Sequence, residues 1–115
     1  DYLTRLDAYT FHEGFAHLLS YQATEIDCVD WHTPQLTEVA AASRAKLRLA
    51  LMETDPDRQK QFLEEAVCGS YYEKFACMCG MLYLADRWET QGIDGLQSAF
   101  ADYHGFAQRA LSIRI

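Results

Sequence analysis

The residues best suited to chemistry lie in one short segment, Phe-His-Glu-Gly-Phe-Ala-His at positions 11–17. A His-Glu pair followed by a second His on one helix can supply two zinc ligands and a general base for water. In the usual spacing the two histidines are four positions apart, which leaves their side chains about 40° from each other around the helix. His12 and His17 are five positions apart. A regular α-helix would therefore separate them by about 140°.

An irregular turn would restore a shared face. A π-bulge accommodates one extra residue in a single turn, and such bulges tend to occur at functional sites. Gly14 lies between the two histidines, and a glycine costs about 1 kcal/mol in a helix interior. We therefore expect a break or an i→i+5 hydrogen bond near Gly14. With that geometry, His12 and His17 are the metal ligands and Glu13 accepts a proton from water.

A third ligand is expected from the next helix. Glu38 shares a helix face with small residues such as Ala41 and Ala42, against which another helix can pack closely. A carboxylate in such a contact is costly to bury unless it is paired or binds a metal. The alternative is that Glu38, near the first turn of its helix, only complements the helix dipole. Glu73 is a weaker candidate because a capping box already explains it.

A tyrosine pair begins the fourth expected helix. Tyr71 or Tyr72 could donate a hydrogen bond to the oxyanion of a tetrahedral intermediate. The alternative is that both rings pack in the core, which is the commoner role of aromatic residues at helical spacing.

Composition sets the broad class of the protein. The chain has 115 residues, enough for one domain with a core of its own. Its formal net charge of −7 argues against nucleic acid or an anionic membrane surface as a partner. No run of residues is long and apolar enough to span a membrane. The chain starts with Asp1 rather than Met, which indicates a processed product or a fragment of a longer protein.

Four cysteines are present, at positions 28, 68, 77 and 79. Three of them lie in apolar helical sequence, so we interpret the cysteines as buried free thiols in a reducing compartment. That interpretation favours a cytoplasmic location. The alternatives are disulfide bonds, or a structural or redox metal site that uses Cys68, Cys77 or Cys79.

Helices must position these groups, because β-branched residues are scarce and Ala, Leu, Gln and Glu are plentiful. Thr33-Pro34 and Asp55-Pro56 each combine an N-cap with a proline at the first helical position. The pattern predicts helices over residues 4–26, 34–53, 56–69, 70–92 and from 94 onward. We expect one all-α domain over residues 1–115, an antiparallel bundle of about five helices.

Taken together, these residues resemble the gluzincin group of zinc metallopeptidases, and small bacterial peptidases in particular. The resemblance rests on His-Glu-spacer-His, a Glu in an Ala-rich second helix, and a Tyr-rich start to a long apolar helix. It implies Zn²⁺ held by His12, His17 and Glu38, Glu13 as base, and Tyr71 or Tyr72 near the carbonyl of a peptide or protein substrate. Such enzymes bind peptides along the edge of a small sheet, and no strand is expected here. The chain could therefore be the helical half of a zincin-like fold.

A non-catalytic helical module is the rival hypothesis. In that case the His-Glu pair is incidental and the chain binds a partner or forms a homodimer. Its abundant aromatic residues, among them Tyr2, Tyr9, Tyr21 and Trp88, could leave an apolar patch exposed for that contact.

Overall fold

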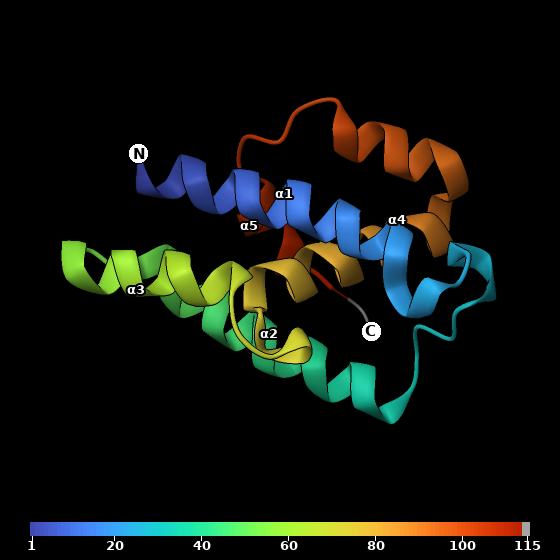
Figure 1. The fold of residues 1–115 in the computed structure, drawn as a ribbon. Helices are drawn as coiled ribbons and strands as arrows, with labels where there is room; N and C mark the ends of the chain where they lie inside the picture. The colour runs from blue at the N-terminus through green and yellow to red at the C-terminus, as the bar shows by residue number, and fades with distance from the viewer. Residues whose placement is uncertain (114–115) are drawn as a thin grey trace.

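The computed structural model describes residues 1–113. No strand occurs among these residues, and the prediction of an all-α bundle is confirmed. None of the described helices is both long enough and apolar enough to cross a lipid bilayer. The five helices in Figure 1 are α1 (Tyr2–Ser20), α2 (Pro34–Met52), α3 (Pro56–Val67), α4 (Phe75–Phe100) and α5 (Phe106–Ala110).

The first half of α4 is the centre of the bundle. Every residue from Phe75 to Asp86 is buried. A helix that is apolar on all sides has to be enclosed by other elements, and α1, α2, α3 and α5 all pack against α4 (Figure 1). The short 3-10 turn η3 (Tyr71–Glu73) leads directly into this central segment. Residues at the start of α4 are therefore held by several neighbours at once.

Helices α1 and α4 cross at two glycines. A Cβ built on Gly80 would lie 1.9 Å from the backbone oxygen of Thr10, and one on Gly14 would lie 2.6 Å from the backbone of Gly80. Real Cβ atoms do not approach other atoms so closely, so the two backbones can meet here only because both residues lack a side chain. Gly14 therefore serves close helix packing.

The irregular turn predicted near Gly14 is absent. Helix α1 is α-helical throughout, and its buried residues are spaced four apart. Phe11 and Phe15 are only half-buried, although both pack against the core. The small and polar residues of α1 face α4 instead, and the Thr10 hydroxyl is satisfied by the Leu6 carbonyl oxygen at 2.7 Å. The buried stripe consists of Leu6, Thr10, Gly14 and Leu18.

Helix starts that combine a cap with a proline were predicted correctly. The Thr33 hydroxyl accepts a hydrogen bond from the Leu36 amide at 3.2 Å, and the Asp55 carboxylate accepts one from the Arg58 amide at 3.0 Å. Each cap satisfies an amide that the first turn leaves free. These are local interactions, which explains why the sequence alone predicts them.

Of the other boundaries, the start and end of α1 and the start of α4 differ from the prediction. Asp1, not Thr4, caps α1, and α1 ends at Ser20 because Gln22 adopts a positive φ of 53°. Ser70 makes no side-chain capping bond, so the expected capping box forms a 3-10 turn instead. Gly92 has non-helical backbone angles (φ 61°, ψ −147°), so α4 consists of two helical segments that meet at a kink there. The break predicted between residues 92 and 94 is therefore confirmed, and α5 is a further, separate element.

A carboxylate of α1 holds α5 in place. Asp7 accepts hydrogen bonds from the amides of Gly105 and Ala107, at 2.9 and 3.0 Å. Helix α5 has only five residues, too few to be stable without tertiary contacts. The Asp7 side chain therefore caps α5 from another helix.

We expect Asp7→Ala to lower the free energy of unfolding by about 1–2 kcal/mol, the usual cost of losing an N-cap. The amide of Ala107 should also exchange faster with deuterium. Urea denaturation and hydrogen exchange measure the two effects. Asp94→Ala is the matched control, since Asp94 is exposed and should shift stability by less than about 0.5 kcal/mol. Equal stability of the two variants would contradict this role of Asp7.

Candidate metal site

The three metal ligands predicted from the sequence do not come together. His12 is exposed, and its ring lies against Phe11 and Tyr103, with centroids 5.0 and 5.8 Å away. Glu38 is exposed on α2. Within residues 1–113, no group of side chains close enough to hold a metal includes His12 or Glu38. The regular geometry of α1 accounts for the separation of His12 from His17, because five positions turn the helix through about 140°.

A different set of ligand atoms converges between α1 and α4. One ligand atom each of Glu13, His17 and Cys77 lies within 4.8 Å of the other two. Glu13 and His17 are four positions apart, so a regular helix places them on one side of α1. Cys77 is contributed by the buried start of α4. Glu13, which was predicted as the base, and His17, which was predicted as a ligand, thus lie close to Cys77, which was not predicted.

Hydrogen bonds fix the protonation of the His17 ring. Its Nδ1 lies 2.6 Å from the backbone oxygen of Glu13, which can only accept. Its Nε2 lies 3.0 Å from the ammonium nitrogen of Lys74, which can only donate. Nδ1 therefore carries the proton, and Nε2 presents a lone pair. Histidines that bind metals commonly donate their other N–H to a carbonyl or carboxylate in this way.

The thiol of Cys77 is fully buried, with none of its surface exposed. Its pKa is raised to about 11, chiefly by burial, with the Lys74 ammonium acting in the opposite direction and nearby Glu13 adding to the rise. Its Sγ lies 3.6 Å from the carbonyl oxygen of Ala66, to which it donates weakly. Such a thiol is protonated at neutral pH and is a poor nucleophile. A metal ion that replaces the proton would convert it to a thiolate ligand.

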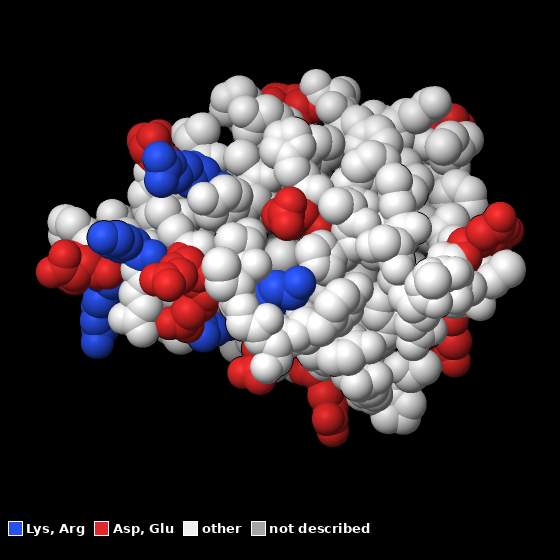
Figure 2. Space-filling model, in the orientation of Figure 1, with Lys and Arg blue, Asp and Glu red and all other residues white. Residues whose placement is uncertain are grey.

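Figure 2 shows the face of the molecule that is seen in Figure 1. Charged groups lie mostly toward the edges of this face, and one acidic and one basic group lie near its centre.

The two tyrosines have different surroundings. The Tyr71 ring lies 5.4 Å from the His17 ring, and the Lys74 ammonium stands 4.9 Å above it. Burial raises the pKa of the Tyr71 hydroxyl. Tyr72 instead shares a hydrogen bond of 2.9 Å with the hydroxyl of Tyr21. The structure thus brings Tyr71, and not Tyr72, to the His17 ring.

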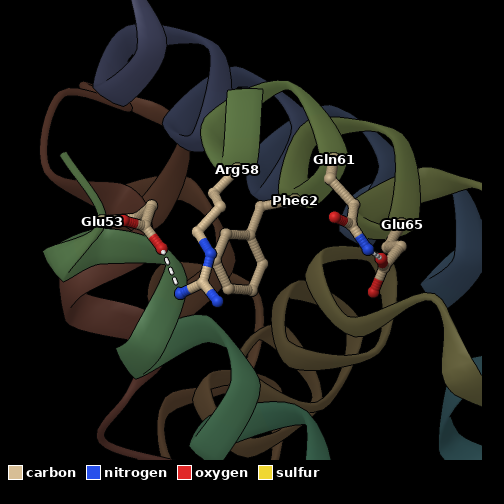
Figure 3. A pocket seen from close by; sticks show the side chains of 5 residues that line it. All are labelled: Glu53, Arg58, Gln61, Phe62 and Glu65. Carbon is tan, nitrogen blue, oxygen red and sulfur yellow. Dashed lines mark hydrogen bonds and ion pairs between the residues drawn. The ribbon is translucent and has the colours of Figure 1, made fainter. Parts of the chain in front are cut away.

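Glu73, the weaker ligand candidate, and the carboxylate of Glu65 both lie away from this cluster. Glu73 is exposed in η3. Glu65 lines a cavity of about 230 Å³ between α2 and α3, together with Glu53, Arg58 and Phe62 (Figure 3). There it accepts hydrogen bonds from Lys46 and Gln61, which lower its pKa. The charges of this cavity are thus largely paired within the chain.

The four cysteines are all free, as predicted, but only Cys77 and Cys79 are buried. Cys68, at the end of α3, and Cys28 are exposed. Cys28 forms a small surface cluster with Glu25 and Asp27. All three of those side chains are exposed, and clusters of exposed acidic groups are common without a ligand.

Sequence reasoning missed Cys77 as a partner of the His-Glu segment. The useful signal was the spacing of Glu13 and His17, which is the four-residue interval that a helix needs. Cys77 itself could not be assigned, because its position depends on how α4 crosses α1. Lys74 was also missed, since nothing local to it indicates a contact with a histidine.

The gluzincin resemblance rests on residues of which His12 and Glu38 lie outside the cluster that the structure forms. It stays a prediction about the family of this protein. No known protein family, curated protein or solved structure matches this chain.

Proposed function

We propose that this chain is a zinc-binding helical domain that holds the ion through Glu13, His17 and Cys77. One observation carries the proposal: three side chains of ligating type, from two helices, have their ligand atoms within 4.8 Å of one another. Zinc bonds of about 2.0–2.3 Å place tetrahedral ligands roughly 3–4 Å apart. Small movements of the three side chains would therefore bring their ligand atoms to the distances that a bound zinc ion requires.

The donor types favour zinc over magnesium or calcium. Thiolate and imidazole are ligands for zinc and its heavier relatives, whereas magnesium and calcium require mainly oxygen. The Nδ1–H bond to the Glu13 carbonyl supports the proposal, because it leaves Nε2 as the unprotonated ring nitrogen that a metal could bind in place of Lys74. Three protein ligands also leave one position of a tetrahedral ion free.

Hydrolysis of peptide bonds, predicted from the sequence, stays a prediction for this site. Bound zinc would supply Lewis-acid polarisation of a carbonyl and activation of water. Glu13 is then either a ligand or the base, and not both at once. Tyr71 is the neighbouring group that could donate to a substrate oxygen. The ligand and base roles of Glu13 can be separated by experiment.

The first experiment is titration of the purified apo protein with Zn²⁺ and with Co²⁺ as a spectroscopic substitute. We expect one ion per chain and a thiolate-to-cobalt charge-transfer band that is lost in Cys77→Ala. The matched control is Cys79→Ala, since Cys79 is equally buried and also on α4 but is not part of the cluster. A cobalt complex without that band, or a band that survives in Cys77→Ala, would overturn the proposed ligand set.

Glu13→Gln tests the role of the carboxylate. If Glu13 is a ligand, the variant should bind zinc about 10²- to 10³-fold more weakly, which is one quarter of the roughly 10–16 kcal/mol of a structural zinc site with four ligands. If Glu13 is a base, zinc affinity should hold and any peptidase turnover should fall by about 10²- to 10⁴-fold. Competition with a chelating dye measures the affinity, and a library of fluorogenic peptides measures the turnover.

A further inference from the structure

The lone pair that a metal needs on His17 is already used. Lys74 donates a hydrogen bond to His17 Nε2 at 3.0 Å. We infer that Lys74 competes with the metal for His17. Its hydrogen bond occupies the Nε2 lone pair until a strongly binding ion displaces the lysine. This inference rests on the proposed zinc site and concerns how that site is regulated.

The position of Lys74 is unusual for its own helix. Lys74 immediately precedes Phe75, the first residue of α4, and occupies the N-cap position without making a capping bond. A positive charge at the N-terminus of a helix is electrostatically unfavourable, and the preferred N-cap residues are Ser, Thr, Asp and Asn. Local helix chemistry therefore does not explain this lysine. Its contact with His17 does.

The Lys74 ammonium has a second contact, besides the one with His17. Its ammonium already lies 4.9 Å above the ring of Tyr71, within the range of a cation–π contact. The Tyr71 side chain is exposed at the surface, so a lysine that leaves His17 can remain on that ring while its charge reaches water. Displacement therefore requires a movement of one side chain and no movement of a helix.

Competition of this kind selects among metals. An ion must break the bond between Lys74 and His17 and must also bind beside a positive charge. Zinc gains enough from imidazole and thiolate ligands to do so, whereas weakly bound ions such as Mg²⁺ and Ca²⁺ do not. Lys74 is thus a residue that sets the affinity and selectivity of the site without touching the metal.

The test compares zinc and cobalt affinities of the wild type, Lys74→Met and Lys74→Arg. Methionine keeps the length of the side chain without its charge, and arginine keeps the charge and the donors. We expect Lys74→Met to bind Zn²⁺ about ten- to one-hundredfold more tightly, the equilibrium equivalent of one hydrogen bond to a charged group. Lys74→Arg should stay within about threefold of the wild type.

A spectroscopic reading separates this role from a merely structural one. In apo protein the ¹⁵N resonance of His17 Nε2 should move in Lys74→Met and stay near its wild-type position in Lys74→Arg, because only the first variant removes a donor. Urea denaturation should give similar stability for all three proteins. Lys74→Ala provides a second variant without charge, should the methionine variant fail to fold.

The possible outcomes are distinct. Tighter zinc binding by the variants that lack the charge supports competition by Lys74. Equal affinity of the wild type and these variants overturns the competition and leaves the zinc site standing. Absence of zinc binding in every protein overturns the zinc site and, with it, this inference.

Discussion

Replacing Gly80 with Ala should destabilise the domain by about 3 kcal/mol or more, a large part of the stability of a small domain. The added Cβ would lie 1.9 Å from the backbone oxygen of Thr10. That atom belongs to the helix α1 backbone and cannot rotate away, so the two helices have to separate. Overpacking of this kind commonly costs 1–3 kcal/mol, and more where only backbone can yield. Urea denaturation followed by circular dichroism measures the change.

Helix propensity works in the opposite direction and provides the control. Ala is favoured over Gly by about 1 kcal/mol in a helix interior, so propensity alone would make Gly80→Ala stabilising. Ala16 is exposed on α1, and Ala16→Gly should therefore cost only that propensity difference. Gly14→Ala should behave like Gly80→Ala, and the double variant should lose less than the sum because both remove one contact. A Gly80→Ala protein as stable as the wild type would rule out the close crossing of α1 and α4.

The same crossing explains why the sequence misled about α1. Phe11 and Phe15 are large apolar residues of this segment, but the residues that meet the α4 backbone at Gly80 are Thr10 and Gly14. Where two backbones approach closely, the contact surface is made of small residues. The irregular turn predicted at Gly14 was wrong. The role of Gly14 in close packing was not visible without its partner, Gly80.

Local signals, in contrast, were reliable. Caps with a following proline, at Thr33-Pro34 and Asp55-Pro56, predicted the first residues of α2 and α3 correctly. A cap depends on the chemistry of about four consecutive residues, all of which the sequence displays. The break expected near Gly92 was also predicted correctly, because a glycine with a positive φ of 61° interrupts the helix there.

The candidate site depends both on local sequence spacing and on the packing of distant helices. Glu13 and His17 share a side of α1 because of their four-residue spacing, which is a local property. Cys77 and Lys74 join them through the packing of α4 and its preceding turn against α1, which is a property of the whole fold. Sequence could therefore identify the segment that contributes two of the three clustered side chains, but not the complete cluster.

Zinc binding should be lost in His17→Ala and retained in His12→Ala and Glu38→Ala. His17 supplies the only imidazole of the proposed cluster, and removing one of its three protein ligands should weaken binding by about 100-fold or more. His12 and Glu38 are exposed and belong to no group of ligands that could hold a metal among residues 1–113. Zinc content after stoichiometric reloading of apo protein, measured by elemental analysis, distinguishes the variants.

This comparison separates two ligand sets. The set predicted from the sequence requires His12, His17 and Glu38 together, so all three alanine variants should then lose zinc. The set formed in the structure requires only His17 among them. Urea denaturation of each apo variant controls for unfolding, since a protein that has lost its fold loses the metal for a trivial reason. Full zinc content in a folded His17→Ala protein would overturn both sets, and the helical interaction module would then be the better hypothesis.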